Sequence, residues 1–91
     1  MRRFIIERDI PSVGIFEREQ LREAAKTSNK ALAQLAPDIQ RVASYAADNK
    51  TFCVYLAKDE AVIYKHAEIS GFPATVITVV KRTIDPTAAA G

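Results

Sequence analysis

The side chains best suited to metal binding or nucleophilic chemistry are the only cysteine of the chain, Cys53, and its only histidine, His66. Both lie in segment 51–66, TFCVYLAKDEAVIYKH, where an alternating strand pattern passes into a helical one. A thiolate and a neutral imidazole are common metal ligands, and a cysteine beside a histidine can also form a nucleophile and its base. The direction in which each side chain points decides which chemistry is open to them.

His66 falls at the centre of the apolar face of a helix predicted over 59–70, one turn from Val62 and Ile63. We therefore expect the imidazole to point inward, where loss of water favours its neutral form. A neutral imidazole can bind a metal or accept a proton. The alternative is a buried histidine that is satisfied by one carbonyl or hydroxyl partner, as buried polar groups usually are.

Cys53 and Tyr55 alternate along a predicted strand with three bulkier apolar residues, Phe52, Val54 and Leu56. We expect the bulkier set to meet the helices, which leaves Cys53 and Tyr55 on the helix-free face. Cys53 and His66 would then approach the sheet from opposite sides, which argues against a catalytic Cys/His pair. A lone cysteine is also often a small buried hydrophobe.

Glu7 lies in the middle of a strand predicted over 3–9, on the same face as Ile5. A carboxylate among apolar residues is costly to bury without a cation or a hydrogen-bond donor. Glu7 is therefore either a metal ligand in a cavity between two sheets or a partly exposed residue paired with Arg3 or Lys81.

Two further residues are candidates for a pocket. Asn29 flanks the buried stripe of the first predicted helix and could form a polar lip. Its neighbour Ser28 lies on that stripe, where we expect its hydroxyl to bond back to a carbonyl one turn earlier. Tyr55 would lie beside Cys53 and Glu7 at a cavity between sheets.

The elements that position these residues follow from hydrophobic periodicity. Strands are predicted over 3–9, 39–46, 51–57 and 74–84, and helices over 17–36 and 59–70. This β-α-β-β-α-β order indicates an α+β, ferredoxin-like domain, with a four-stranded antiparallel sheet and two helices on one face. We expect one domain over 1–87 and a flexible C-terminal tail over 88–91.

The predicted helix-free face is more apolar than a soluble monomer usually tolerates, with Ile5, Cys53, Tyr55 and valines of the last strand on it. We therefore expect a homodimer that packs sheet to sheet around a two-fold axis, as an α+β barrel that encloses a cavity.

The composition of the 91 residues, 48% hydrophobic and 26% charged, is typical of one globular domain. The apolar runs are too short to cross a bilayer, and a net charge of +2 gives no strong attraction to nucleic acid. The start of the chain lacks the apolar stretch of a signal peptide, and a lone cysteine forms no internal disulfide. These features predict a cytoplasmic protein that binds neither membranes nor nucleic acid.

One cysteine and one histidine cannot build a closed zinc site within a single chain. A metal site here needs carboxylates, backbone oxygens and water, or ligands repeated across a dimer interface. Such mixed nitrogen and oxygen ligands suit nickel or another divalent ion better than structural zinc. We nominate Glu7, Cys53 and His66 as candidate ligands, and we expect no organic cofactor.

Several segments, spread from about residue 3 to 87, resemble a known family: FIIERDIP from Phe4, SN from Ser28, APDIQ from Ala36, KTFCVY from Lys50 and HAEISGFPA from His66. The chain resembles short bacterial proteins of an uncharacterised-domain family that includes a nickel-responsive, nickel-binding member with a dimeric ferredoxin-like fold. Arg41 stands where many relatives are expected to carry an aromatic residue.

The resemblance implies a small dimeric protein that binds a divalent metal, with nickel as the first candidate. Our first hypothesis is therefore a metal-binding homodimer that does not catalyse a reaction. The alternative interpretation is a dimeric α+β-barrel protein that binds or transforms a small organic molecule in a cavity beside Glu7, Cys53 and Tyr55. This alternative depends on similarity of fold alone.

Overall fold

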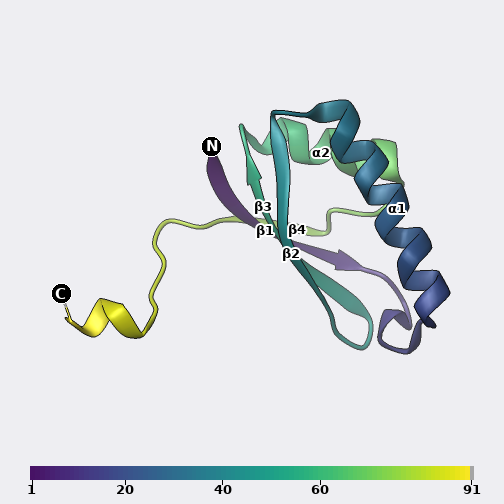
Figure 1. The fold of residues 1–91 in the computed structure, drawn as a ribbon, viewed down its shortest axis with the longest axis horizontal. Helices are drawn as coiled ribbons and strands as arrows, with labels where there is room; N and C mark the ends of the chain where they lie inside the picture. Colours follow the sequence, from purple (N-terminus) through teal and green to yellow (C-terminus); the bar gives the residue numbers. More distant parts are fainter. Residues whose placement is uncertain (91) are drawn as a thin grey trace.

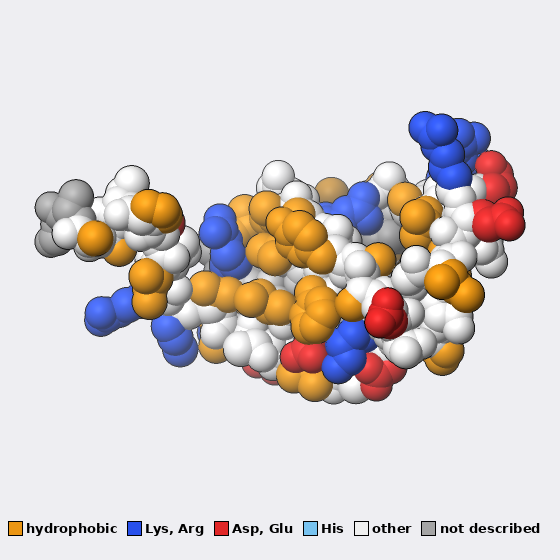
Figure 2. All heavy atoms as spheres, turned by 90° about the horizontal axis from the view of Figure 1, so that it is seen from below, with side chains coloured by type: hydrophobic (Ala, Val, Ile, Leu, Met, Phe, Trp, Pro, Cys, Tyr) orange, Lys and Arg blue, Asp and Glu red, His pale blue; other side chains and the backbone are white. Residues whose placement is uncertain are grey.

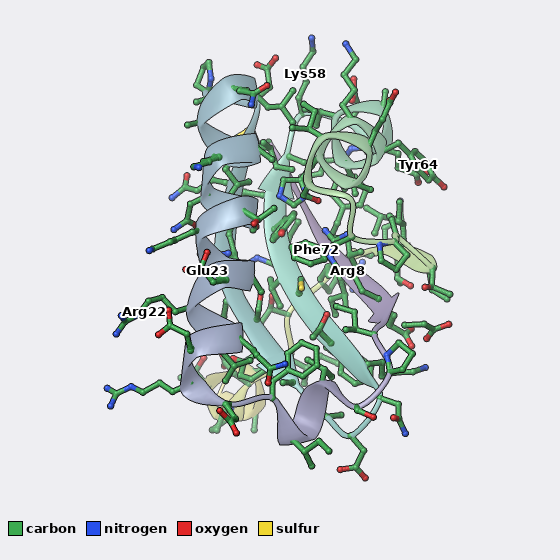
Figure 3. All side chains as sticks on the ribbon, turned by 90° about the vertical axis from the view of Figure 1, so that its right-hand side faces the viewer. Arg8, Arg22, Glu23, Lys58, Tyr64 and Phe72 are labelled. Atoms are coloured by element: carbon green, nitrogen blue, oxygen red, sulfur yellow. The ribbon has the colours of Figure 1, made fainter. Side chains whose placement is uncertain are left out.

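The computed structural model describes residues 1–90 and contains one four-stranded antiparallel sheet, in the order β2-β3-β1-β4. The strands are β1 (Arg2–Asp9), β2 (Ile39–Ala46), β3 (Lys50–Ala57) and β4 (Val76–Val79). The helices are α1 (Arg18–Leu35) and α2 (Glu60–Ser70), with two short 3-10 helices, η1 (Val13–Ile15) and η2 (Pro86–Ala90). Both α-helices lie on one side of the sheet (Figures 1 and 3). The predicted ferredoxin-like α+β fold is confirmed.

Local chemistry sets the ends of both helices close to the predicted positions. α1 begins in a capping box, in which the Glu17 backbone N donates to Gln20 Oε1 at 2.8 Å. α2 begins where Asp59 Oδ1 accepts a hydrogen bond from the Val62 backbone N at 3.0 Å. It ends at Gly71, whose φ of 80° is the left-handed conformation that favours glycine.

The last strand is shorter than the predicted 74–84. β4 covers only Val76–Val79 and pairs with β1 in a register that places Val79 opposite Phe4. The Val80 backbone N still donates to the Arg3 carbonyl at 2.8 Å, but the chain beyond it has almost no β1 backbone left to pair with. The hydrophobic pattern of residues 74–84 carries no information on where β1 begins, so it could not predict where β4 ends.

The side chains of β3 face the opposite way from the prediction. Cys53 and Tyr55 lie across from Ile6 and Phe4 of β1, and all four are buried on the helix side. Phe52 is 37% exposed on the helix-free face instead. Both alternating sets of side chains on β3 are apolar, so the prediction that Phe52, Val54 and Leu56 face the helices depended only on their larger size. That prediction was wrong. A tyrosine can be buried when its hydroxyl finds a partner.

The helix-free face of the sheet still exposes large apolar side chains. Ile5, Tyr45, Phe52 and Val76 are all at least one-third exposed. Seen from below in Figure 2, apolar side chains reach the surface in a broad band across the middle of the molecule. Ile5 and a valine of the last strand lie on this face as predicted, whereas Phe52 lies there in place of Cys53 and Tyr55. The face is apolar, as expected.

The division into one domain over 1–87 and a flexible tail over 88–91 stays a prediction. η2 lies apart from the body of the molecule (Figure 1), and residue 91 lies outside the described residues. Among the residues that the structure describes, no helix combines the length and apolar character needed to cross a membrane.

Candidate functional site

His66 lies at the centre of a buried polar cluster between the helices and the sheet. Its side chain points inward from α2 and is fully buried. Nδ1 lies 3.3 Å from Arg8 Nη2, and Nε2 lies 3.2 Å from Ser28 Oγ. Burial, reinforced by the nearby Arg8 and Arg41 guanidiniums, lowers the His66 pKa from 6.5 to about 4, although an interaction with Ser28 raises it. The imidazole is therefore neutral at physiological pH.

The contacts of the ring also assign its tautomer. Arg8 can only donate hydrogen bonds, so Nδ1 must accept. A neutral imidazole then carries its hydrogen on Nε2, which donates to Ser28 Oγ. Both ring nitrogens are thus occupied by neighbouring side chains. The predicted bond from Ser28 back along its own helix is not among the described contacts, and the Ser28 oxygen lies 3.2 Å from His66 Nε2 instead.

Arg8 is the most unusual residue of the cluster, because its side chain is charged and only 2% of the residue is exposed. Nη1 donates to the carbonyls of Phe72 and Pro73 at 3.3 and 3.0 Å. Nη2 lies 3.5 Å from the Tyr55 hydroxyl as well as near His66. Figure 3 shows Arg8 and Phe72 close together in the middle of the molecule. None of the ion pairs within residues 1–90 includes Arg8.

Arg41 extends the cluster from β2, just before an irregularity in the pairing with β3. Its Nη1 donates to Ser28 Oγ at 3.2 Å, and its Nη2 donates to Asn29 Oδ1 at 2.7 Å. It too lacks a carboxylate partner in the described part of the chain. A chain of hydrogen bonds therefore runs from Arg41 through Ser28 and His66 to Arg8.

A pocket of about 440 Å³ opens beside this cluster, between α1 and the sheet. Cys53 and Tyr55 line it from β3, together with Arg8, Ser28 and Arg41. The rest of the lining is mostly apolar and comes from α1, η1, β2, β3 and the neighbouring loops. Asn29 does not line the pocket, but it accepts a hydrogen bond from Arg41, which does line it. A cavity of this size and character can take a small organic molecule.

The three nominated metal ligands do not come together within one chain. Cys53 and His66 lie on the helix side of the sheet, so the argument that they approach from opposite sides was wrong. Glu7 lies on the helix-free side, where Lys50 Nζ is 3.3 Å from its Oε1. Within residues 1–90 no group of three or more histidine, cysteine, aspartate and glutamate side chains is placed to hold a metal ion.

The surroundings of His66 fit a metal poorly. Its two nitrogens are occupied, and the guanidiniums of Arg8 and Arg41 repel a divalent cation. Glu7 fits better, because its side chain is 29% exposed and Asp9, two residues further along β1, points to the same side. Lys50 Nζ lies between the two carboxylates, 3.3 Å from Glu7 and 4.0 Å from Asp9.

Sequence reasoning missed both arginines of the cluster. Arg8 continues the inward-facing alternation of Phe4 and Ile6, and this was the one signal that could have found it. A charged residue near the end of a strand is normally assigned to the surface. Arg41 was noted only as a departure from an expected aromatic residue, because its contacts with Ser28 and Asn29 depend on how β2 packs against α1.

The sequence matches the family model for nickel responsive proteins of the SCO4226-like type over residues 4–80. Among solved structures, a crystal structure of SCO4226 from Streptomyces coelicolor A3(2) is similar, with a TM-score of 0.70 and 19% sequence identity. The match covers 90% of this chain and 99% of that chain. No curated protein matched the chain significantly.

Proposed function

The chain belongs to the nickel responsive SCO4226-like family, and we propose that it is a small cytoplasmic protein that binds nickel ions without catalysing a reaction. The observation that carries this proposal is the family match over residues 4–80. Within the structure, the proposal is supported by carboxylates on the exposed face of the sheet, and it does not need the buried cluster around His66.

We propose Glu7 as a nickel ligand, with Asp9 beside it. Both carboxylates already share the ammonium group of Lys50, so a cation is accommodated between them. Oxygen ligands completed by water hold divalent ions, and at a given site nickel binds more tightly than manganese or iron(II). A bound ion would displace Lys50. Cys53 and His66 are not retained as ligands, because they lie on the other side of the sheet.

Two carboxylates alone make a weak site, and a second protomer is the natural source of more ligands. The exposed apolar residues on the helix-free face support a homodimer formed through this face. Glu7 and Asp9 belong to the same face, so the proposed interface and the proposed metal site are neighbours. In this proposal the dimer places two copies of the carboxylate pair near one interface.

Calorimetric titration of untagged, metal-free protein with nickel tests the proposal. We expect saturable heat with a dissociation constant on the order of micromolar. Glu7→Gln should weaken binding by at least about tenfold, since even the loss of a supporting residue around a metal commonly costs that much. His66→Gln and Cys53→Ser should leave the affinity unchanged.

Glu23→Gln is the matched control, because Glu23 is exposed on α1, where it pairs with Lys26 at 3.5 Å. It should bind nickel as the wild type does. Absence of binding heat in the wild type would sink the proposal of nickel binding. Unchanged affinity in Glu7→Gln would contradict the proposed ligand.

A further inference from the structure

The pocket between α1 and the sheet is open because α1 is longer than α2. α2 has 11 residues and α1 has 18, and the N-terminal half of α1 reaches past α2. Leu21 belongs to the apolar stripe of α1, yet it is 45% exposed, since it faces the pocket together with Ala24 and Ala25. An apolar helix face is thus left beside an open cavity of about 440 Å³.

The segment around η1 forms part of the pocket wall. Gly14 lies against the β2–β3 turn, and its backbone N donates to the Asp48 carbonyl at 3.0 Å. A Cβ at Gly14 would lie 2.7 Å from the Ala47 carbonyl oxygen, so only glycine allows this approach. The neighbouring Val13 and Phe16 then line the pocket with apolar surface.

The polar end of the pocket carries positive charge without a counterion. Arg8 and Arg41 both line it, and neither pairs with a carboxylate within residues 1–90. None of the described residues that line the pocket is acidic. A buried guanidinium that has hydrogen bonds but no opposite charge remains costly, because hydrogen bonds to neutral partners do not neutralise it.

Ser28 adds a hydrogen-bond donor at the same end. Its oxygen accepts from Arg41 and from His66 Nε2, which uses both lone pairs. The hydroxyl hydrogen therefore remains to be donated, and Ser28 lines the pocket. Two guanidiniums and a hydroxyl donor around one end, with apolar walls beyond, match a negatively charged head group attached to an apolar body.

We propose that this pocket binds a small organic anion, of the class of carboxylic acids with an apolar body, with the carboxylate toward Arg8, Arg41 and Ser28. The body lies against the N-terminal half of α1 and η1. The inference is separate from nickel binding, because the pocket residues repel a divalent cation and Glu7 lies on the other side of the sheet.

The test is a ¹H–¹⁵N NMR titration of the metal-free protein with 3-phenylpropionate. The neutral 3-phenylpropanamide lacks the charge, and acetate lacks the apolar body. We expect 3-phenylpropionate to shift the amides of Ser28, Arg41 and Cys53 with saturation below about 10 mM, a realistic limit for so small a ligand. The amide and acetate should each bind at least about tenfold more weakly, the loss expected for one charge-assisted contact.

Arg41→Gln removes one charge from the pocket while Arg8 remains to hold the buried cluster together. It should raise the dissociation constant for 3-phenylpropionate about tenfold. Arg22→Gln is the matched control, because it also removes one arginine charge, but from the side of α1 that points away from the sheet (Figure 3). This variant should bind as the wild type does.

Three results would overturn the inference. The first is no saturation up to about 10 mM. The second is equal affinity for the carboxylate and the amide, which would remove the role of charge. The third is equal weakening by Arg22→Gln and Arg41→Gln. None of these results bears on the nickel titration, in which Arg41→Gln should retain wild-type affinity.

Discussion

His66 is buried, lies near two guanidiniums and has a neutral ring, and each of these properties follows from where α2 packs. The ring meets the edge of Tyr55 at a centroid distance of 5.4 Å, with an angle of 81° between the planes. Arg8 holds one nitrogen and Ser28 the other. The residue whose chemistry first suggested a metal ligand is thus a structural link between both helices and the sheet, and it keeps Ser28 oriented at the pocket.

His66 should make stability depend on pH. Its pKa is about 4 in the folded protein and about 6.5 when unfolded. As pH falls from 6.5 towards 4, the unfolded chain gains a proton that the folded protein excludes, so the free energy of unfolding decreases. Between about pH 7 and pH 4.5 the loss should be about 2 kcal/mol from this residue.

Urea unfolding at these two pH values checks the expectation. His66→Gln keeps a neutral hydrogen-bonding side chain that cannot gain the proton, so its loss of stability over the same range should be smaller by about 2 kcal/mol. An equal loss in wild type and variant would show that His66 is not the titrating group. Ser70→Ala, elsewhere on α2, serves as the control.

The sequence predicted correctly which strands and helices form and in what order, but it predicted less well which way their side chains face. The bounds of α1, α2, β2 and β3 agree with the prediction to within about one residue, because caps and turn residues are local signals. The orientation of β3 was wrong, because both of its faces are apolar and only pairing with β1 decides between them. The predicted length of β4 was too great because the end of β4 is set by where its partner β1 begins.

The candidate site was predicted only in part, because some of its residues come together only when the elements pack. The inward direction of His66 follows from helical periodicity within one element. Arg8 joins the site through contacts with residues far away in the sequence, as in its bond to the Pro73 carbonyl, and Arg41 joins it through contacts with the preceding helix. Such contacts depend on how the elements pack, which no single pattern contains.

The exposed face of the sheet leads to a prediction about assembly. Phe52→Lys places a charge in the apolar helix-free face, which should dissociate the proposed homodimer in sedimentation velocity experiments. Tyr64→Lys is the matched control, because Tyr64 is 55% exposed but points away from the molecule on α2 (Figure 3). It should remain a dimer. A wild-type protein that sediments as a monomer at all concentrations would contradict the proposal.

For the molecule as a whole, the sheet separates two chemically different sides. The helix side holds a pocket lined by two guanidiniums, and no acidic residue lines it within the described part of the chain. The helix-free side carries Glu7 and Asp9 around Lys50. Opposite charge preferences on the two faces would let one small domain bind a cation and an organic anion without competition between them.

Locating bound nickel is the most direct test of the central proposal, that this protein binds nickel on the helix-free face of its sheet. Paramagnetic nickel broadens the NMR signals of nearby amides, so a ¹H–¹⁵N titration with nickel maps the site. We predict that broadening is strongest at Glu7, Asp9 and Lys50 and spares Ser28 on α1. Broadening that begins at His66 and Ser28 would contradict the account.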